Sequence, residues 1–262
     1  MPEFATGEPS GPGVVYYEEL RPADPHGDVL LLHNFMSTGR AAWGVVADKL
    51  AKTFRVILPD LPGHGRSVGY PPGFIHRDLA AQIAALMRAL GAVSPHVAGA
   101  SSGGMVAVWL VQAGLLSPAT LTLVSSAYSI NPATTGIAVD LDPASFRAAR
   151  HWLTATAKLH DEHQGAGYFD AVILPAFRAQ TPETALDLPI AALRAWRLPV
   201  CLVHGAEDEI FPVALATQMH AALPDSEYHV VPDEGHALIL RRPRLVGDIL
   251  QAFLARHPAP VP

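Results

Sequence analysis

One serine of the sequence lies in a pattern that is typical of an enzyme nucleophile. Gly99-Ala100-Ser101-Ser102-Gly103 follows an apolar run and precedes a helical pattern, which is the context that the G-x-S-x-G signature requires. A turn this tight forces strained dihedral angles on its central residue, and flanking glycines remove side chains that would collide there. We therefore predict that Ser101 is the nucleophile. Ser102 is the competing serine, but only one glycine matches when the signature is centred on it.

A serine hydroxyl is a weak nucleophile until a base takes its proton, so a histidine must lie within hydrogen-bond reach of it. His236 is predicted to be this base, because it follows the last predicted strand in a glycine-containing loop before the closing helix. Asp208 is predicted to orient the imidazole, since it lies directly after the preceding predicted strand. Its neighbours Glu207 and Glu209 are predicted to be solvated loop charges.

Several other histidines are predicted to be structural. His64 lies among turn residues and is expected to brace a loop, whereas His33, His96 and His204 border predicted strands. A hydrogen-bonded, buried imidazole is the simpler interpretation for each of them. The dense cluster His160-Asp161-Glu162-His163 is interpreted as a solvated helix end in preference to a metal site.

The elements that must hold these residues alternate between strand and helix. Continuous apolar runs predict buried strands, and apolar residues three and four positions apart predict the helices between them. This alternation predicts an α/β fold with a mostly parallel central sheet flanked by helices. The predicted strands are residues 14–20, 29–33, 54–58, 96–99, 120–125, 200–204 and 228–231, with helices at 102–113 and 244–255.

Residues 128–198 break this alternation and read as short helices separated by prolines and glycine. We predict an inserted helical cap there, above the carboxyl ends of the strands, where ligands of open α/β sheets bind. The core then consists of residues 14–127 and 199–262. Residues 1–13 are rich in proline and glycine and are predicted to be a disordered tail.

The predicted cap is rich in aromatic residues, which indicates an apolar pocket beneath it. An aromatic side chain of the cap can also pack against the sheet without lining a pocket. The pocket is therefore predicted from these residues as a set and not from each of them separately. The residues predicted to line the substrate pocket are Asn34, Tyr168, Phe169 and Phe177, and further aromatic residues of the cap are Phe146, Trp152 and Trp196.

Taken together, the motifs resemble those of the α/β-hydrolases, over about residues 14–255. The segments that carry the resemblance are His33-Asn34-Phe35-Met36, Asp60-Leu61-Pro62-Gly63-His64-Gly65-Arg66-Ser67, residues 99–103, His204-Gly205-Ala206-Glu207-Asp208 and Gly235-His236. The chain order Ser101, Asp208, His236 is the one expected of this fold. The resemblance implies that the N–H groups of Phe35 and Ser102 form an oxyanion hole. Asn34 departs from the family pattern, which has glycine at that position.

The resemblance implies acyl transfer to water, with Ser101, His236 and Asp208 as a catalytic triad. Few charges cluster in the cap, which favours a carboxylesterase-like hydrolase of small to medium apolar esters or lactones. One alternative is a hydrolase of carbon–carbon bonds in ring-cleavage products, for which Arg147, Arg150 or Arg178 would bind a carboxylate. Another alternative is a receptor that binds a small ligand without turnover.

Composition excludes other classes of function. Lys and Arg number 18 against 24 Asp and Glu, a formal net charge of −6, so no basic surface for nucleic acid is expected. No apolar run is long enough for a membrane helix, and the first residues lack the pattern of a secretory signal, so a cytoplasmic protein is expected. Cys201, the single cysteine, is predicted to be inert and buried. We predict no metal and no cofactor.

Overall fold

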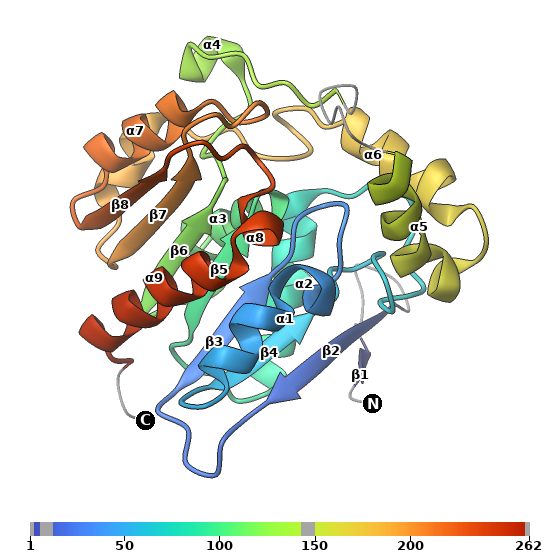
Figure 1. Cartoon of the computed structure of the whole chain (residues 1–262), viewed down its shortest axis with the longest axis horizontal. Coiled ribbons are helices and arrows are strands. Elements are labelled where there is room, and N and C mark those ends of the chain that lie inside the picture. Colours follow the sequence, from blue (N-terminus) through green and yellow to red (C-terminus); the bar gives the residue numbers. More distant parts are fainter. Residues whose placement is uncertain (1–2, 6–12, 143–149, 260–262) are drawn as a thin grey trace.

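The computed structural model describes residues 3–5, 13–142 and 150–259. Within these residues one sheet of eight strands runs in the order β1-β2-β4-β3-β5-β6-β7-β8 (Figure 1). Strands β4 to β8 of this order are parallel, whereas β2 runs antiparallel to β4 and β1 antiparallel to β2. The strands are β1 Glu3–Ala5, β2 Val14–Leu20, β3 Asp28–Leu32, β4 Arg55–Pro59, β5 His96–Ala100, β6 Thr120–Val124, β7 Val200–Gly205 and β8 Ser226–Val231. The predicted α/β fold is therefore confirmed.

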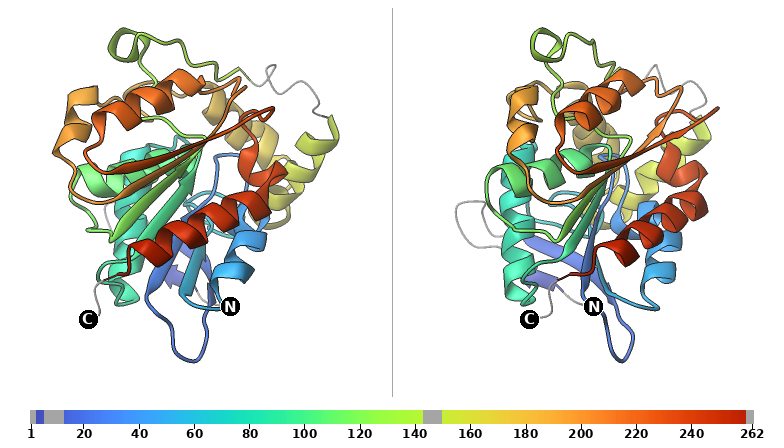
Figure 2. Two further views of the ribbon diagram at one scale, coloured as in Figure 1. Left: turned by 60° about the vertical axis from the view of Figure 1, so that its left-hand side comes forward. Right: turned by 90° about the vertical axis from the view of Figure 1, so that its left-hand side faces the viewer.

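Helices cover both faces of the sheet, which explains why its central strands are apolar on both sides. Figure 2 shows α1 (Gly39–Leu50) and α9 (Pro243–Arg256) on one face, with α2 (His76–Ala89) and α3 (Ser102–Gln112) on the other. Alternate strand residues divide between two buried clusters. Leu31 and Val203 pack on the side of α1 and α9, and Leu32 and Leu202 pack on the side of α2 and α3. Both faces of the parallel strands are thus buried in the core.

An insertion at residues 125–199 separates β6 from β7. It contains α4 Pro132–Thr135, α5 Arg150–Gln164, the π-helical turn η2 Phe169–Ile173, α6 Leu174–Arg178 and the 3-10 helix η3 Ile190–Ala195. In the described part of this segment the extended pairing is limited to an isolated bridge between Ser129 and Asp187. Figure 1 shows α4, α5 and α6 at the end of the molecule away from both labelled termini. The cap predicted for residues 128–198 falls within this segment, and its role as a cap stays a prediction.

The prediction for the amino terminus is wrong in part. Residues 3–5 of the predicted disordered tail form β1, which pairs with Val14, Val15 and Tyr16 of β2. Without β1, the outer side of β2 would present N–H and C=O groups that have no partner in the sheet. Even a segment of three residues gains backbone hydrogen bonds by pairing there. Phe4 also packs against the core. Residues 1–2 and 6–12 of the same prediction lie outside the described residues.

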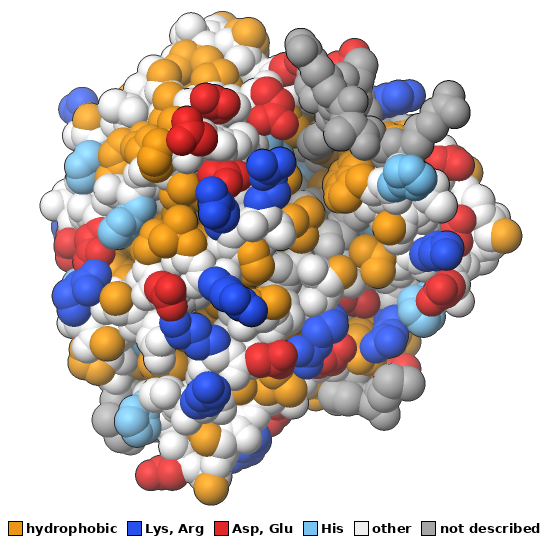
Figure 3. Space-filling view, viewed as in Figure 1, with side chains coloured by type: hydrophobic (Ala, Val, Ile, Leu, Met, Phe, Trp, Pro, Cys, Tyr) orange, Lys and Arg blue, Asp and Glu red, His pale blue; other side chains and the backbone are white. Residues whose placement is uncertain are grey.

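The face of the molecule drawn in Figure 3 carries charges of both signs. These side chains are interspersed, and no broad basic patch is present on this face. Among the helices of the described residues, none is both long enough and apolar enough to cross a membrane.

Candidate active site

Ser101 lies at the sharp turn between β5 and α3. Its backbone has φ +51° and ψ −119°, a left-handed region that non-glycine residues rarely adopt and that costs energy. The two glycines of the signature permit this turn because backbones approach closely on both sides. A Cβ at Gly99 would lie 2.4 Å from the carbonyl oxygen of Gly103, and one at Gly103 would lie 2.3 Å from that of Leu32. The turn predicted from the G-x-S-x-G signature is present.

The structure brings Ser101, His236 and Asp208 together from three separate loops. The Ser101 hydroxyl donates to Nε2 of His236 at 2.8 Å, and Nδ1 of His236 lies 2.9 Å and 3.0 Å from the two carboxylate oxygens of Asp208. A carboxylate can only accept, so the Nδ1 atom carries the proton and Nε2 keeps its lone pair. This tautomer is the one that can remove a proton from Ser101.

Asp208 is held as an anion by its surroundings. Its Oδ1 accepts from the backbone N–H groups of Ile210 at 3.0 Å and Phe211 at 2.8 Å. Its Oδ2 lies 3.2 Å from Nε2 of His204, which also donates to the carbonyl oxygen of Phe211. Burial by itself would raise the pKa of Asp208, but the charge interaction with His236 and the hydrogen bond of His204 outweigh it and hold the pKa below its usual value.

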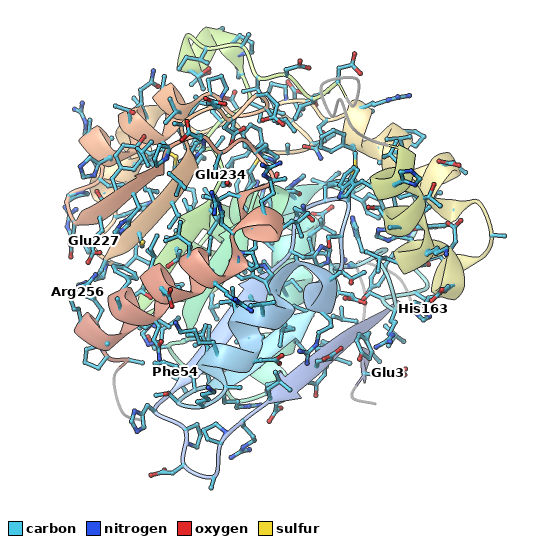
Figure 4. All side chains as sticks on the ribbon, viewed as in Figure 1. Glu3, Phe54, His163, Glu227, Glu234 and Arg256 are labelled. Carbon is cyan, nitrogen blue, oxygen red and sulfur yellow. The ribbon has the colours of Figure 1, made fainter. Side chains whose placement is uncertain are left out.

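The loop that carries His236 is fastened by a buried carboxylate. Glu234 lies on the loop between β8 and α8 (Leu238–Arg241), as Figure 4 shows. Its side chain is ion-paired with Arg241 at 2.9 Å and with Arg242 at 2.5 Å. Its backbone oxygen accepts from the N–H of Glu207, on the loop that carries the acid. The loops that carry Asp208 and His236 are therefore joined directly.

Three contacts in this region were not predicted from the sequence. Glu209 is exposed, as expected of a loop charge, but its carboxylate also accepts the backbone N–H of His236 at 3.0 Å. His204 is buried as predicted, yet its partner is Asp208. The ring of Phe211 packs edge-on against the ring of His236, with the centroids 5.1 Å apart. No local sequence pattern indicates the contact of Glu209 with His236, because the two residues are 27 positions apart.

The two residues predicted to supply oxyanion N–H groups lie on adjacent elements. Ser102 opens α3, where the first N–H groups have no acceptor within the helix. Phe35 follows β3, whose end lies against the same turn, since a Cβ at Gly103 would also meet the carbonyl oxygen of His33 at 2.4 Å. Both residues are buried, at 2% exposure each.

The residues predicted to line a pocket occupy two different places. Phe177 is buried and its ring packs against that of Phe35, with centroids 5.9 Å apart, next to the active-site turn. Tyr168 and Phe169 instead join the insertion to the core: the Tyr168 hydroxyl donates to the carbonyl oxygen of Gly63, and the Phe169 ring stacks on an imidazole of α5. The side-chain oxygen of Asn34 is buried, with no hydrogen-bond partner in the described part of the chain.

An open pocket of about 460 Å³ lies in the insertion. Its described lining is Ile130, Val139, Leu141, Asp142, Arg178, Gln180 and Pro182. The N–H of Asp140, within the same segment, donates to the carbonyl oxygen of Ile210 at 3.3 Å, so this segment lies beside the loop of the acid. Of the arginines considered for carboxylate binding, Arg178 lines this pocket. Phe146, Arg147 and the side chain of Arg150 lie outside the described residues.

Buried histidines brace the loops around the site. Nε2 of His33 accepts the N–H of Leu61 at 2.7 Å, and burial lowers the pKa of His33 to about 3. His64 is likewise fully buried, with its Nδ1 atom 3.1 Å from the carbonyl oxygen of Pro62. Both agree with the structural roles predicted for them.

The interpretation of the cluster in α5 as a solvated helix end is wrong for His160. This residue is fully buried, and its Nδ1 accepts the N–H of Gly65 at 3.1 Å. Gln164, one turn further along α5, donates to the carbonyl oxygens of Gly65 and Ser67 in the loop after β4, so this side of the helix faces the core instead of water. His163 is exposed, and Figure 4 shows it at the outer edge of the molecule.

No group of three or more His, Cys, Asp or Glu side chains that could hold a metal occurs among the described residues. Cys201 is buried, which raises its pKa to about 12.

Comparisons with known proteins agree with the fold. The model of a family described as the alpha/beta hydrolase family matches residues 29–249. A pimeloyl-(acyl-carrier protein) methyl ester esterase of Serratia marcescens is 28% identical over 254 residues, which cover 88% of this chain and 94% of that protein. The crystal structure of an esterase from Rhodococcus sp. superposes with a TM-score of 0.74 at 20% identity, covering 98% of each chain. A meta-cleavage product hydrolase from Pseudomonas fluorescens has a TM-score of 0.74 at 17% identity, covering 96% of this chain and 98% of that one.

Proposed function

The chain belongs to the alpha/beta hydrolase family, and we propose that it is a serine hydrolase of carboxylic esters or lactones with small to medium apolar groups. The observation that carries the proposal is the continuous hydrogen-bond path from the Ser101 hydroxyl through His236 to Asp208, at 2.8 Å and 2.9 Å. This path supports nucleophilic attack by a serine oxygen, because the imidazole lies within hydrogen-bond reach of the serine hydroxyl on one side and of the carboxylate that orients it on the other.

In the proposed mechanism, the Ser101 oxygen attacks the carbonyl carbon of the substrate while its proton passes to Nε2 of His236. The resulting imidazolium is stabilised by the Asp208 carboxylate, which remains ionised. The carbonyl oxygen becomes an oxyanion, for which we propose the N–H groups of Ser102 and Phe35 as donors. Collapse of the tetrahedral intermediate breaks the ester bond, and the imidazolium returns the proton to the leaving alcohol. Water then repeats the cycle on the acyl-enzyme, releasing the acid and restoring Ser101.

The nature of the surrounding side chains supports an apolar substrate. Phe35 and Phe177 pack together next to the nucleophile turn, and Phe211 covers the imidazole of the base. We propose that residues 128–198 act as a cap over this site. Two contacts across the boundary support this role: His160 of α5 accepts from Gly65, and Tyr168 donates to Gly63, both in the loop after β4.

The proposal is tested by hydrolysis of p-nitrophenyl acetate, butyrate and octanoate at neutral pH by the wild-type chain and by Ser101→Ala. We expect turnover by the wild type and a loss of at least about 10³-fold in kcat for the variant, since a triad without its nucleophile keeps little activity. Ser117→Ala, which alters an exposed serine, is the matched control and should retain full activity. Absence of turnover by folded wild-type protein, or equal turnover by Ser101→Ala, would refute the proposal.

A further inference from the structure

A second buried histidine lies against the serine that follows the nucleophile. His76 is the first residue of α2 and is fully buried. Its Nε2 atom is 2.6 Å from the Ser102 hydroxyl oxygen, and its Nδ1 atom is 3.2 Å from the carbonyl oxygen of Thr184 in the insertion. No step of the proposed mechanism uses this side chain, although one of its partners is a proposed oxyanion donor.

The partners of His76 determine its tautomer. A carbonyl oxygen can only accept, so Nδ1 carries the proton that is shared with Thr184. Nε2 is then an acceptor and takes the hydrogen of the Ser102 hydroxyl. Burial lowers the pKa of His76 to about 4, so the ring is neutral at physiological pH and this arrangement persists. The Ser102 side chain is thus fixed in one rotamer by a buried hydrogen bond.

His76 also contacts the other residue proposed for the oxyanion hole. Its ring lies 6.2 Å from the ring of Phe35, measured between centroids, at an interplanar angle of 32°. One imidazole therefore packs against Phe35 and holds Ser102 by a hydrogen bond. Displacement of this ring would release both residues at once.

The opposite side of His76 is joined to the insertion by several bonds. The backbone N–H of His76 donates to the carbonyl oxygen of Thr184 at 2.9 Å, in addition to the ring contact. The next carbonyl group, that of Ala185, accepts from the indole N–H of Trp109 in α3 at 2.7 Å. Thr184 itself is held in a tight turn with Thr181. This part of the insertion is therefore anchored to both helices that carry His76 and Ser102.

We propose that His76 is a positioning residue, which holds Ser102 and Phe35 so that their N–H groups face the developing oxyanion and which links this geometry to the insertion at Thr184. The inference rests on the proposed hydrolase function. Misplacement of a reacting group by about 1 Å can cost on the order of 10²-fold in rate. Partial misplacement of an oxyanion donor is therefore expected to lower kcat by about tenfold, with little effect on KM.

Three substitutions at this position separate its two hydrogen bonds. His76→Gln can keep an acceptor near the position of Nε2, facing Ser102. His76→Asn can keep a polar atom near the position of Nδ1, facing Thr184, but cannot reach Ser102. His76→Phe removes both bonds at similar volume. Ser102→Ala removes the hydroxyl from the other side and leaves the backbone N–H in place.

The experiment measures kcat and KM for p-nitrophenyl butyrate, the Ki of an aryl trifluoromethyl ketone that mimics the tetrahedral oxyanion, and the melting temperature. We expect kcat to fall about tenfold in His76→Phe, His76→Asn and Ser102→Ala, with Ki raised by a similar factor and KM within about threefold of wild type. His76→Gln keeps an acceptor for Ser102 but loses the ring and the bond to Thr184, so its kcat should fall less than that of His76→Phe, by about threefold. The double variant His76→Phe/Ser102→Ala should be no slower than the slower single variant, because both changes remove the same bond.

A matched control is a buried histidine outside the site. His96 is 1% exposed, bonds to the Thr120 hydroxyl at 2.9 Å and begins β5, about 16 Å along that strand from Ser101. His96→Phe should lower the melting temperature without changing Ki. A purely structural role for His76 would give this same pattern, with lowered stability and unchanged kcat and Ki, and would overturn the inference. Multiplicative losses in the double variant would also overturn it.

Labelling of Ser101 by a fluorophosphonate distinguishes failure of this inference from failure of the proposed function. Unlabelled, inactive wild-type protein would refute the hydrolase function itself. Labelled and active wild type with unaffected His76 and Ser102 variants would refute the positioning role alone. Should His76→Phe not fold, Ser102→Ala decides the test, since it deletes the same hydrogen bond with a smaller change in packing.

Discussion

Replacement of Asp208 by asparagine is expected to reverse the tautomer of His236. Oδ1 of Asp208 receives the backbone N–H groups of Ile210 at 3.0 Å and Phe211 at 2.8 Å. An amide NH2 group cannot occupy that position, because two fixed donors would face it. The asparagine oxygen therefore lies at Oδ1, and its NH2 group at the position of Oδ2, 3.0 Å from Nδ1 of His236. His204, whose Nε2 atom is 3.2 Å from Oδ2, keeps its shorter bond of 2.8 Å to the carbonyl oxygen of Phe211, so Oδ2 faces fewer obligatory donors than Oδ1.

An NH2 group at that position favours a lone pair on Nδ1 of His236 and places the proton on Nε2. Nε2 then presents a hydrogen to the Ser101 oxygen, 2.8 Å away, and can no longer act as a base. The loss expected for a triad in the wrong tautomer is about 10³- to 10⁴-fold in kcat. This corresponds to about 4 to 5.5 kcal/mol of activation free energy.

The assay compares wild type, Asp208→Asn and Glu207→Gln with p-nitrophenyl butyrate at pH 7.5, together with the rate of fluorophosphonate labelling at Ser101. Glu207 is exposed in the same loop, so its variant removes one charge without touching the triad and should retain full activity. Thermal unfolding verifies that all three proteins are folded. If folded Asp208→Asn kept kcat within tenfold of wild type, the reasoning from the amide orientation would be refuted.

Three further predictions concern the framework of the site. Gly103→Ala should destabilise the protein by about 3 kcal/mol, because its Cβ would meet the Leu32 carbonyl oxygen at 2.3 Å; an unchanged urea midpoint would contradict this. Burial lowers the pKa of His33 to about 3 and of His160 to about 4, so below pH 6.5 the unfolded chain binds protons that the folded chain does not. Stability should therefore fall between pH 7.5 and pH 5, by about 2 kcal/mol for each group, and equal urea midpoints at the two pH values would exclude this coupling. Glu209→Ala should lower kcat about threefold, because the base loses the acceptor of its backbone N–H, and Glu207→Ala serves as the control.

The sequence by itself determined those features that depend on neighbouring residues. The apolar runs predicted the strands of the parallel sheet, because a strand covered by helices on both faces must be apolar on both sides. The glycines around Ser101 predicted a strained turn, and the structure has φ +51° at that residue. Chain order and the ends of strands were sufficient to select Asp208 and His236 as its partners. The strands and the turn required only a short window of sequence, whereas the choice of Asp208 and His236 also required the chain order expected of the fold and the rule that parallel strands end at one edge.

Only the tertiary structure decided which side chains meet across distant segments. His204 bonds to Asp208, Glu209 to the backbone of His236, and His76 to Ser102, and none of these contacts has a local pattern. The same limit explains why residues 3–5 were not predicted to form an edge strand and why His160 was expected to be solvated. Burial and hydrogen bonding depend on what another element brings alongside, and that arrangement exists only once the sheet, its helices and the insertion have packed together.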